Sequence, residues 1–192
     1  YEPYIIKRRR YFHAHPELSF KEWDTTKALV AEFEKMGMEI QTFPDYPGLI
    51  ATLDTGKPGR TVMLRADIDA LPVKEGTGLD FASQNEGVMH ACGHDNHMAM
   101  LLGAAHILLE KKDELKGKVK FLLQSGEEMA CGAKYYVDHH ILDGVDAIFG
   151  QHIWGTLDAP YVCVASGNRM ASCDNFTIRV KGLQSHGSAP QD

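Results

Sequence analysis

The chain of 192 residues lacks any long apolar run and any excess of positive charge. No stretch approaches the roughly eighteen consecutive apolar residues that a membrane-spanning helix requires. Lysine and arginine together number 20 against 26 aspartate and glutamate residues, so the formal net charge is −6. A chain of this charge offers no basic field for nucleic acid or anionic lipid. These absences argue against a membrane-spanning or nucleic-acid-binding protein.

Cysteine is also scarce, with four residues at positions 92, 131, 163 and 173. So few thiols in a chain of this length do not resemble a disulfide framework. We therefore expect a reducing compartment and a cytoplasmic protein. The first residue is Tyr1 rather than Met, so the sequence leaves open whether a targeting segment preceded it.

The remaining composition is that of a globular protein, because 44% of the residues are apolar and 24% are charged. Runs with helical spacing alternate with short apolar runs, which predicts an α/β fold with a mixed sheet. We expect helices over residues 5–14, 21–36, 95–111 and 132–140, and strands over residues 39–43, 49–53, 61–66, 118–124 and 147–151. Asp95 or Asn96 is the expected N-cap of the third helix. Residues 74–88 form an aperiodic polar loop, a type of segment that often carries function.

The pattern of apolar and polar residues changes near residue 166. Residues 175–182 alternate apolar and polar side chains, as a half-exposed antiparallel strand does. The sequence therefore predicts one domain over residues 1–165 and the beginning of a second over residues 166–192.

The most informative segment runs from Met89 to Asp95 and holds His90, Cys92 and His94. Thiol, imidazole and carboxylate groups all bind first-row divalent metals. A buried thiol beside a solvated turn histidine would be the simpler interpretation for either residue alone. The density of donors in so short a segment favours a metal site.

Further polar groups follow the predicted strands: Asp67 and Asp69, then Glu127 and Glu128, then His152. In open α/β sheets, ligands collect beyond the carboxyl ends of strands, so these groups are expected to share one site. Adjacent buried carboxylates are costly unless a metal or protons neutralise them. Two exposed carboxylates on a turn are the alternative, and His152 by itself decides nothing.

The other histidines are less informative. His97 is a possible third ligand, although packing or a supporting position is preferred, and His90 is left open. His139 and His140 lie near a helix C-terminus and are read as structural. His13 and His15 flank a helix end and are assigned no chemistry.

Four motifs, RADIDALP, MHACGHDNH, SGEE and FGQHIW, occur in this order, and HAHPELSF precedes them. The chain thereby resembles the amidohydrolase branch of the aminoacylase and carboxypeptidase-G-like family of dinuclear metallohydrolases. That branch includes hippurate hydrolases, N-acyl-amino-acid deacylases and auxin-conjugate hydrolases. The resemblance covers essentially the whole chain and implies a mixed-sheet catalytic domain over residues 1–165 and the beginning of a smaller α+β lid or dimerisation domain over residues 166–192.

The resemblance also implies site residues for two divalent ions, which could be Zn, Mn, Ni or Co. The implied ligands are Cys92 (bridging both ions), His94, Glu128 and His152. Glu127 would be the catalytic base, and Asp69 would orient a ligand. His186, in SHGSAP, would stabilise the oxyanion or hold the substrate carboxylate, often across a homodimer interface.

The sequence departs from the family pattern in three places. The wider family has His where Asp67 stands, which is consistent with this branch. Many relatives have His where Gln191 stands, so no role is assigned there. A further His ligand lies far downstream in the family, beyond residue 192, and family members are roughly twice this length, more than one compact core usually supports. We therefore expect the chain to be a fragment.

The expected reaction is hydrolysis of the amide bond of an N-acyl amino acid by a metal-bridged hydroxide, with Glu127 as general base. Two alternatives remain. Cys92 could be the nucleophile of a thiol amidase with His94 or His90 as its base. A catalytically impaired relative could instead be a metal-binding or peptide-binding module.

Overall fold

The computed structural model describes residues 1–172 and 176–191. Cys173 and the first residue of the strand expected over 175–182 lie outside this range. The chain divides into two compact units, Tyr1–Asp158 and Ala159–Asp192. The assignment of residues 166–192 to a lid domain stays a prediction.

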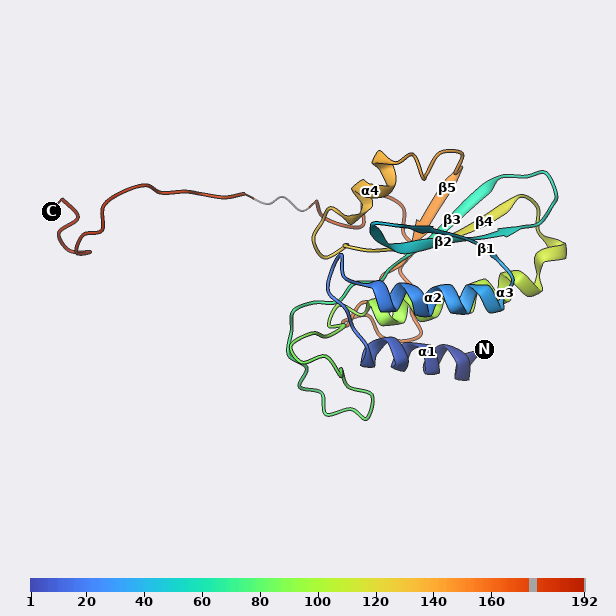
Figure 1. Cartoon of the computed structure of the whole chain (residues 1–192), viewed down its shortest axis with the longest axis horizontal. Helices are drawn as coiled ribbons and strands as arrows, with labels where there is room; N and C mark the ends of the chain where they lie inside the picture. The colour runs from blue at the N-terminus through green and yellow to red at the C-terminus, as the bar shows by residue number, and fades with distance from the viewer. Residues whose placement is uncertain (173–175, 192) are drawn as a thin grey trace. The chain divides into compact units, whose positions relative to one another are not determined.

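The first unit is built on a five-stranded mixed sheet, which confirms the expected fold class (Figure 1). Its strands are β1 (Glu39–Phe43), β2 (Tyr46–Asp54), β3 (Thr61–Asp67), β4 (Lys118–Gln124) and β5 (Ala147–Gly150), in the order β1-β2-β4-β3-β5. The β1–β2 and β2–β4 pairs are antiparallel, whereas β3 is parallel to both β4 and β5. The three parallel strands therefore end at the same edge of the sheet.

Helices cover both faces of this sheet. The helices α1 (Glu2–Ala14), α2 (Trp23–Lys35) and α3 (His94–Glu110) lie on one face, and a 3-10 turn follows at Lys112–Glu114 (Figure 1). Successive strand residues point to opposite faces, so Phe121 and Leu123 of β4 join the core under these helices. Leu122 joins the smaller cluster on the other face with Tyr136 of α4 (Gly132–Asp138).

The N-cap of helix α3 lies two or three residues earlier than the sequence predicted. Its N-cap is Gly93 rather than Asp95 or Asn96, and Gly93 has φ 102°. Only glycine adopts this left-handed conformation readily. Asp95 is instead inside the first turn, and its carboxylate pairs with Arg9 and His13 of α1. The N-cap prediction was wrong because a tertiary ion pair takes up the side chain that would have capped the helix.

The chain reverses its direction of winding at β3. It passes from β3 through α3 to β4 on one side, and then through α4 to β5 on the other side. Such a switch point leaves a crevice beyond the carboxyl ends of the strands, where ligands bind in open α/β sheets. Asp67 is the last residue of β3 and lies at this place.

The second unit has little regular structure among its described residues. No strand is assigned to residues 176–182, although the sequence predicted one there. A strand needs a hydrogen-bonded partner, and the described part of this unit supplies none. An isolated bridge joins His186 to Ala189, and the His186 Nδ1 atom lies 2.8 Å from the Ser188 hydroxyl. Among the described residues of the chain, no helix is long and apolar enough to span a membrane.

Gly48 of β2 provides a test of this packing. Its φ is +105°, and an added Cβ atom would lie 2.5 Å from the Leu123 carbonyl oxygen and 2.6 Å from the Tyr136 hydroxyl. We expect Gly48→Ala to lower the free energy of unfolding by about 2 kcal/mol or more, because backbone strain and overpacking add. Gly76→Ala is the matched control, since nothing lies within 4 Å of its added Cβ. Equal urea midpoints for the two variants would contradict this packing.

Candidate metal centre

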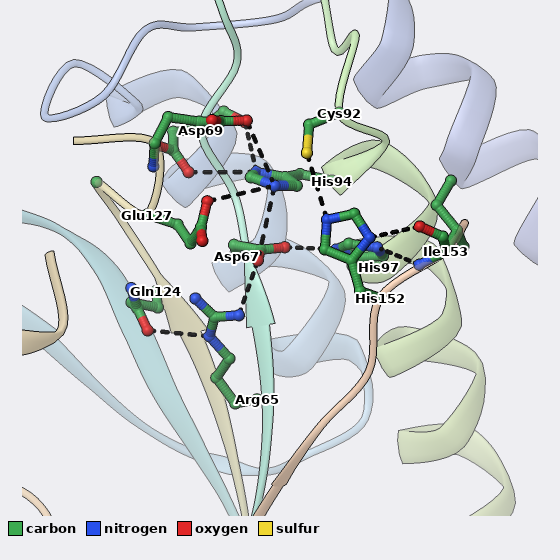
Figure 2. Close-up of polar contacts among 12 residues, drawn as sticks. Arg65, Asp67, Asp69, Cys92, His94, His97, Gln124, Glu127, His152 and Ile153 are labelled. Carbon is green, nitrogen blue, oxygen red and sulfur yellow. Dashed lines mark hydrogen bonds and ion pairs between the residues drawn. The ribbon is translucent and has the colours of Figure 1, made fainter. Parts of the chain in front are cut away.

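The residues predicted as metal ligands meet at the carboxyl ends of β3, β4 and β5 (Figure 2). Among the residues that the structure describes, three groups of potential ligands have ligand atoms within 4.8 Å of one another. These groups are Cys92, His94 and His152; His94, Glu127 and Glu128; and Asp67, His94 and His97. His94 belongs to all three and is therefore the centre of the site.

The His94 imidazole is completely buried and faces carboxyl groups from two strand ends. Its Nε2 atom lies 3.7 Å from Asp67, 3.8 Å from Glu127 and 3.7 Å from Glu128. Its Nδ1 atom is 2.9 Å from the main-chain oxygen of Asp69. An Nδ1–H donor to this carbonyl leaves the Nε2 lone pair pointing toward the carboxylates, the arrangement typical of a metal-ligating histidine.

Asp67 already has protein partners. Its carboxylate oxygens lie 2.7 Å from Arg65 Nη1 and 2.5 Å from His97 Nδ1 (Figure 2). Burial alone would raise the pKa of Asp67, but the hydrogen bond from His97 and the charge of Arg65 outweigh it and lower the pKa to about 2. Asp67 is therefore an ionised group whose charge the protein itself balances.

Asp69 holds the chain around the site. Its Oδ2 atom accepts a hydrogen bond from the Ser19 hydroxyl at 2.7 Å and another from the Glu128 main-chain N–H at 3.0 Å. Together with the His94 contact, Asp69 links β3, α3 and the turn after β4. Its carboxylate thus contacts the His94 ring and the main chain of Glu128, two predicted ligands. The orienting role of Asp69 stays a prediction.

Cys92 and His152 approach from two other segments. The Cys92 sulfur lies 3.3 Å from His152 Nε2 (Figure 2). Burial and the neighbouring Glu128 carboxylate raise the pKa of the Cys92 thiol to about 12. With no cation present the sulfur is therefore a protonated thiol and a poor nucleophile. A divalent cation would reverse this, because coordination deprotonates a thiol.

Two buried atoms test whether a cation fits. Within the described part of the chain, His94 Nε2 and Glu128 Oε1 both lack a hydrogen-bond partner, which is costly for buried polar atoms. They are 3.7 Å apart. Nitrogen and oxygen ligands of one tetrahedral zinc ion lie about 3.4 Å apart, so a shared cation needs only a small adjustment. The donor set of sulfur, nitrogen and oxygen therefore fits a first-row divalent metal.

Glu127 differs from its neighbour Glu128 in exposure. The Glu127 side chain is 40% exposed and that of Glu128 is 19% exposed. Burial and the Asp67 carboxylate raise the pKa of Glu127 above its ordinary value. Both carboxylates lie beside His94, but Glu127 is the more open to solvent, which suits separate roles for the pair.

The remaining central histidines have different surroundings. His97 uses both ring nitrogens, since Nδ1 bonds Asp67 and Nε2 accepts the Ile153 main-chain N–H at 3.0 Å. It therefore supports the segment that carries His152 rather than offering a free ligand atom, although it lies close enough to ligate. His90 is buried and neither of its ring nitrogens has a partner, so its role stays open.

Several supporting residues were missed by sequence reasoning. Arg65 balances Asp67, and Glu22 accepts hydrogen bonds from the turn before Glu127. His13 was assigned no chemistry, yet it is buried between the carboxylates of Asp95 and Glu75. HAHPELSF and RADIDALP contain three of the missed residues (His13, Ser19 and Arg65), but no spacing rule connects them to the site.

Comparison with known proteins also indicates a hydrolase. The profile of peptidase family M20/M25/M40 matches residues 63–188. The N-acyl-L-amino acid amidohydrolase of Geobacillus stearothermophilus is 42% identical over 97% of the chain and 50% of its own length. The N-acetylcysteine deacetylase of Bacillus subtilis is 43% identical over 98% of the chain and 50% of its own length.

A solved structure shows the same fold. The YXEP protein of Bacillus subtilis, described as a dinuclear metal binding peptidase from the M20 family, superimposes with a TM-score of 0.77 and 45% identity. The match covers 80% of this chain and 43% of that one. The chain thus spans about half the length of the curated relatives it matches.

Cobalt provides a test of sulfur ligation. We expect the full-length protein to bind Co²⁺ with a thiolate-to-metal absorption band in the near ultraviolet, and Cys92→Ser to abolish that band because the sulfur is gone. Cys163→Ser is the control, since Cys163 is exposed and belongs to none of the three ligand groups. An unchanged band in Cys92→Ser would remove this residue from the ligand set.

Proposed function

The chain belongs to the peptidase family M20/M25/M40, and on this basis we propose that the whole protein is a metal-dependent amidohydrolase acting on N-acyl amino acids. The products would be a carboxylic acid and a free amino acid. The names of the relatives support this class of substrate, because they include an N-acyl-L-amino acid amidohydrolase, an N-acetylcysteine deacetylase and an indoleacetyl-amino acid hydrolase-like protein of Arabidopsis thaliana.

One observation carries the proposal: the unpartnered His94 Nε2 and Glu128 Oε1 atoms face each other inside a cluster of carboxylates. Cys92 and His152, whose ligand atoms are 3.3 Å apart, complete the proposed set of metal ligands. We propose that these residues hold two divalent ions, and Zn, Mn, Ni and Co can all be bound by sulfur, nitrogen and oxygen donors. When bound, such ions lower the pKa of water and polarise a carbonyl group.

The chain's own residues would move the proton. Glu127 lies beside the proposed ligands with its carboxylate partly open, and its pKa is raised above the ordinary value. It would accept a proton from the attacking water and deliver it to the nitrogen of the leaving amine. His186 is proposed to stabilise the oxyanion or hold the substrate carboxylate, and Asp69 to orient His94 and Glu128.

The environment of Cys92 argues against the thiol-amidase alternative. A nucleophilic cysteine needs positive surroundings that favour the thiolate. Glu127 and Glu128 instead raise the pKa of Cys92, together with burial. The alternative of a non-catalytic metal-binding or peptide-binding module is distinguished by the hydrolysis assays below.

We further propose a homodimer formed through the lid domain and a cytoplasmic location. The location follows from the chemistry of the site, because a metal-binding thiol such as Cys92 persists best in a reducing compartment. No nucleic-acid or membrane partner is proposed.

Glu127→Gln tests the role of the general base. The amide keeps the size of the side chain but cannot accept the proton, so we expect kcat to fall by roughly 10²- to 10⁴-fold. Metal content, measured by elemental analysis of the full-length protein, should stay at the wild-type level. Loss of metal from this variant would show that Glu127 is a ligand rather than the base.

Metal removal tests the reaction class. We expect a chelator to abolish hydrolysis of N-acetyl, N-benzoyl or indoleacetyl amino acids by the full-length protein, and added Zn²⁺, Mn²⁺, Ni²⁺ or Co²⁺ to restore it. Activity that survives complete metal removal but is lost with a thiol-alkylating reagent would favour the cysteine nucleophile. A metal-loaded protein that cleaves no member of the panel would favour a binding module.

A further inference from the structure

Glu22 is a buried carboxylate on the segment between α1 and α2, far in sequence from the proposed ligands. Its side chain has no measurable exposure, and it forms no ion pair among the described residues. Burial raises its pKa to about 7. An unpaired carboxylate in such a place destabilises a fold more than an apolar side chain would. The hydrogen bonds that the carboxylate accepts must therefore offset the cost of burying it.

The hydrogen bonds that the Glu22 side chain accepts from other residues come from the turn that follows β4. The Ser125 hydroxyl lies 2.8 Å and 2.7 Å from its two carboxylate oxygens, and the Gly126 main-chain N–H donates to Oε1 at 3.2 Å. Ser125 is itself completely buried. Glu127 and Glu128 are the next two residues along the chain. The carboxylate of Glu22 thus holds Ser125 and Gly126, the two residues that directly precede the proposed base and ligand.

Glu22 is in turn held firmly by its own main chain. Its carbonyl oxygen accepts the Thr26 N–H at 2.9 Å and the Thr26 hydroxyl at 2.6 Å. The Thr26 hydroxyl oxygen also accepts the N–H of Gly48 in β2 at 2.8 Å. The main chain of Glu22 is therefore anchored to α2 and, through Thr26, to the sheet. A side chain on such a fixed backbone can impose a position on the turn rather than follow it.

Neighbouring residues hold the same turn from the same segment. The Phe20 ring covers Gly126 so closely that a Cβ atom there would lie 2.2 Å from Phe20 Cε1. Ser19 bonds Asp69, and Asp69 accepts the main-chain N–H of Glu128. Phe20 and Glu22 thus contact the turn directly, and Ser19 is linked to it through Asp69.

We propose that Glu22 is a positioning residue for the metal centre: its buried carboxylate fixes the Ser125–Gly126 turn and thereby sets where Glu127 and Glu128 lie. The inference deepens the proposed function and rests on it for the meaning of those two side chains. Glu22 itself touches neither metal nor substrate. Supporting groups of this kind typically change metal affinity or activity by roughly 10- to 100-fold.

Two substitutions at position 22 separate positioning from packing and from charge. Glu22→Met keeps the length of the side chain but offers no acceptor, whereas Glu22→Gln keeps an oxygen for the Gly126 N–H. In the full-length protein, we expect Glu22→Met to lower kcat or Co²⁺ affinity by roughly 10- to 100-fold and Glu22→Gln by less than about tenfold. A packing role predicts no loss in either variant, and a charge role predicts equal loss in both; either outcome overturns the proposal.

A measurement on the metal-free protein makes the test independent of activity. We expect amide hydrogen exchange at Gly126, Glu127 and Glu128 to accelerate by about tenfold or more in Glu22→Met, because the turn loses its acceptor. Exchange at the wild-type rate would overturn the positioning role. If the wild-type protein hydrolyses no N-acyl amino acid, the proposed function fails, while the exchange rates still decide the role of Glu22.

Glu32→Met is the matched control. Glu32 is also a buried glutamate, but it lies within α2, and its partners Tyr4, Arg8 and Lys35 belong to α1 and α2 rather than to the turn. We expect Glu32→Met to lower Tm without changing exchange at residues 126–128 or kcat. Should Glu22→Met fail to fold, Ser125→Ala removes one partner of Glu22 and should accelerate the same amides; no acceleration there counts against the proposal.

Discussion

Negative charge collected around one buried imidazole is the constraint on which the rest of the site depends. The carboxyl groups of Asp67, Asp69, Glu127 and Glu128 all lie 3.3 to 3.8 Å from the ring nitrogens of His94. Like charges this close cannot all stay ionised without compensation. Arg65 balances the charge of Asp67, which also has a hydrogen bond with His97, but no lysine or arginine among the described residues pairs with either glutamate. The two glutamates need protons or a cation from outside, and the proposed divalent metal would supply that charge beside His94 Nε2 and Glu128 Oε1, which have no partner among the described residues.

The topology of the sheet brings these charges together. Because β4 and β5 flank β3 and all three run parallel, their carboxyl ends share one edge. The strands β3 and β4 carry buried apolar residues and are followed at once by polar side chains, so these polar groups lie at the rim of a packed layer rather than in it. The winding reversal at β3 keeps that rim open, since α3 and α4 leave on opposite faces. The antiparallel strands β1 and β2 contribute no proposed ligand and serve as the platform behind the site.

Local patterns in the sequence were sufficient for the elements and for the donor-rich segments. The strands at residues 39–43 and 118–124 have the predicted bounds, because apolar alternation and flanking turn residues act within a few positions. The start of α3 was misplaced because the Asp95 side chain is bonded to His13 of α1, which lies 82 residues away in the sequence. The strand expected over residues 175–182 depends on a partner strand that its local pattern cannot reveal. Long-range pairing, rather than propensity, accounts for both differences.

The same limit applies to roles within the site. His94 and His97 stand three residues apart on one helix. His94 Nε2 lies 3.7 Å and His97 Nδ1 lies 2.5 Å from a carboxylate oxygen of Asp67. What separates them is which lone pair is free: His97 Nε2 is taken by the Ile153 N–H, whereas His94 Nε2 has no partner. Glu22 and Glu128 differ in the same way. The Glu22 carboxylate accepts hydrogen bonds from the turn at Ser125 and Gly126, whereas Glu128 Oε1 has no partner among the described residues. Residue type and spacing define the candidates for a metal site, but the hydrogen bonds already made by each atom decide which of them can ligate and which can only support.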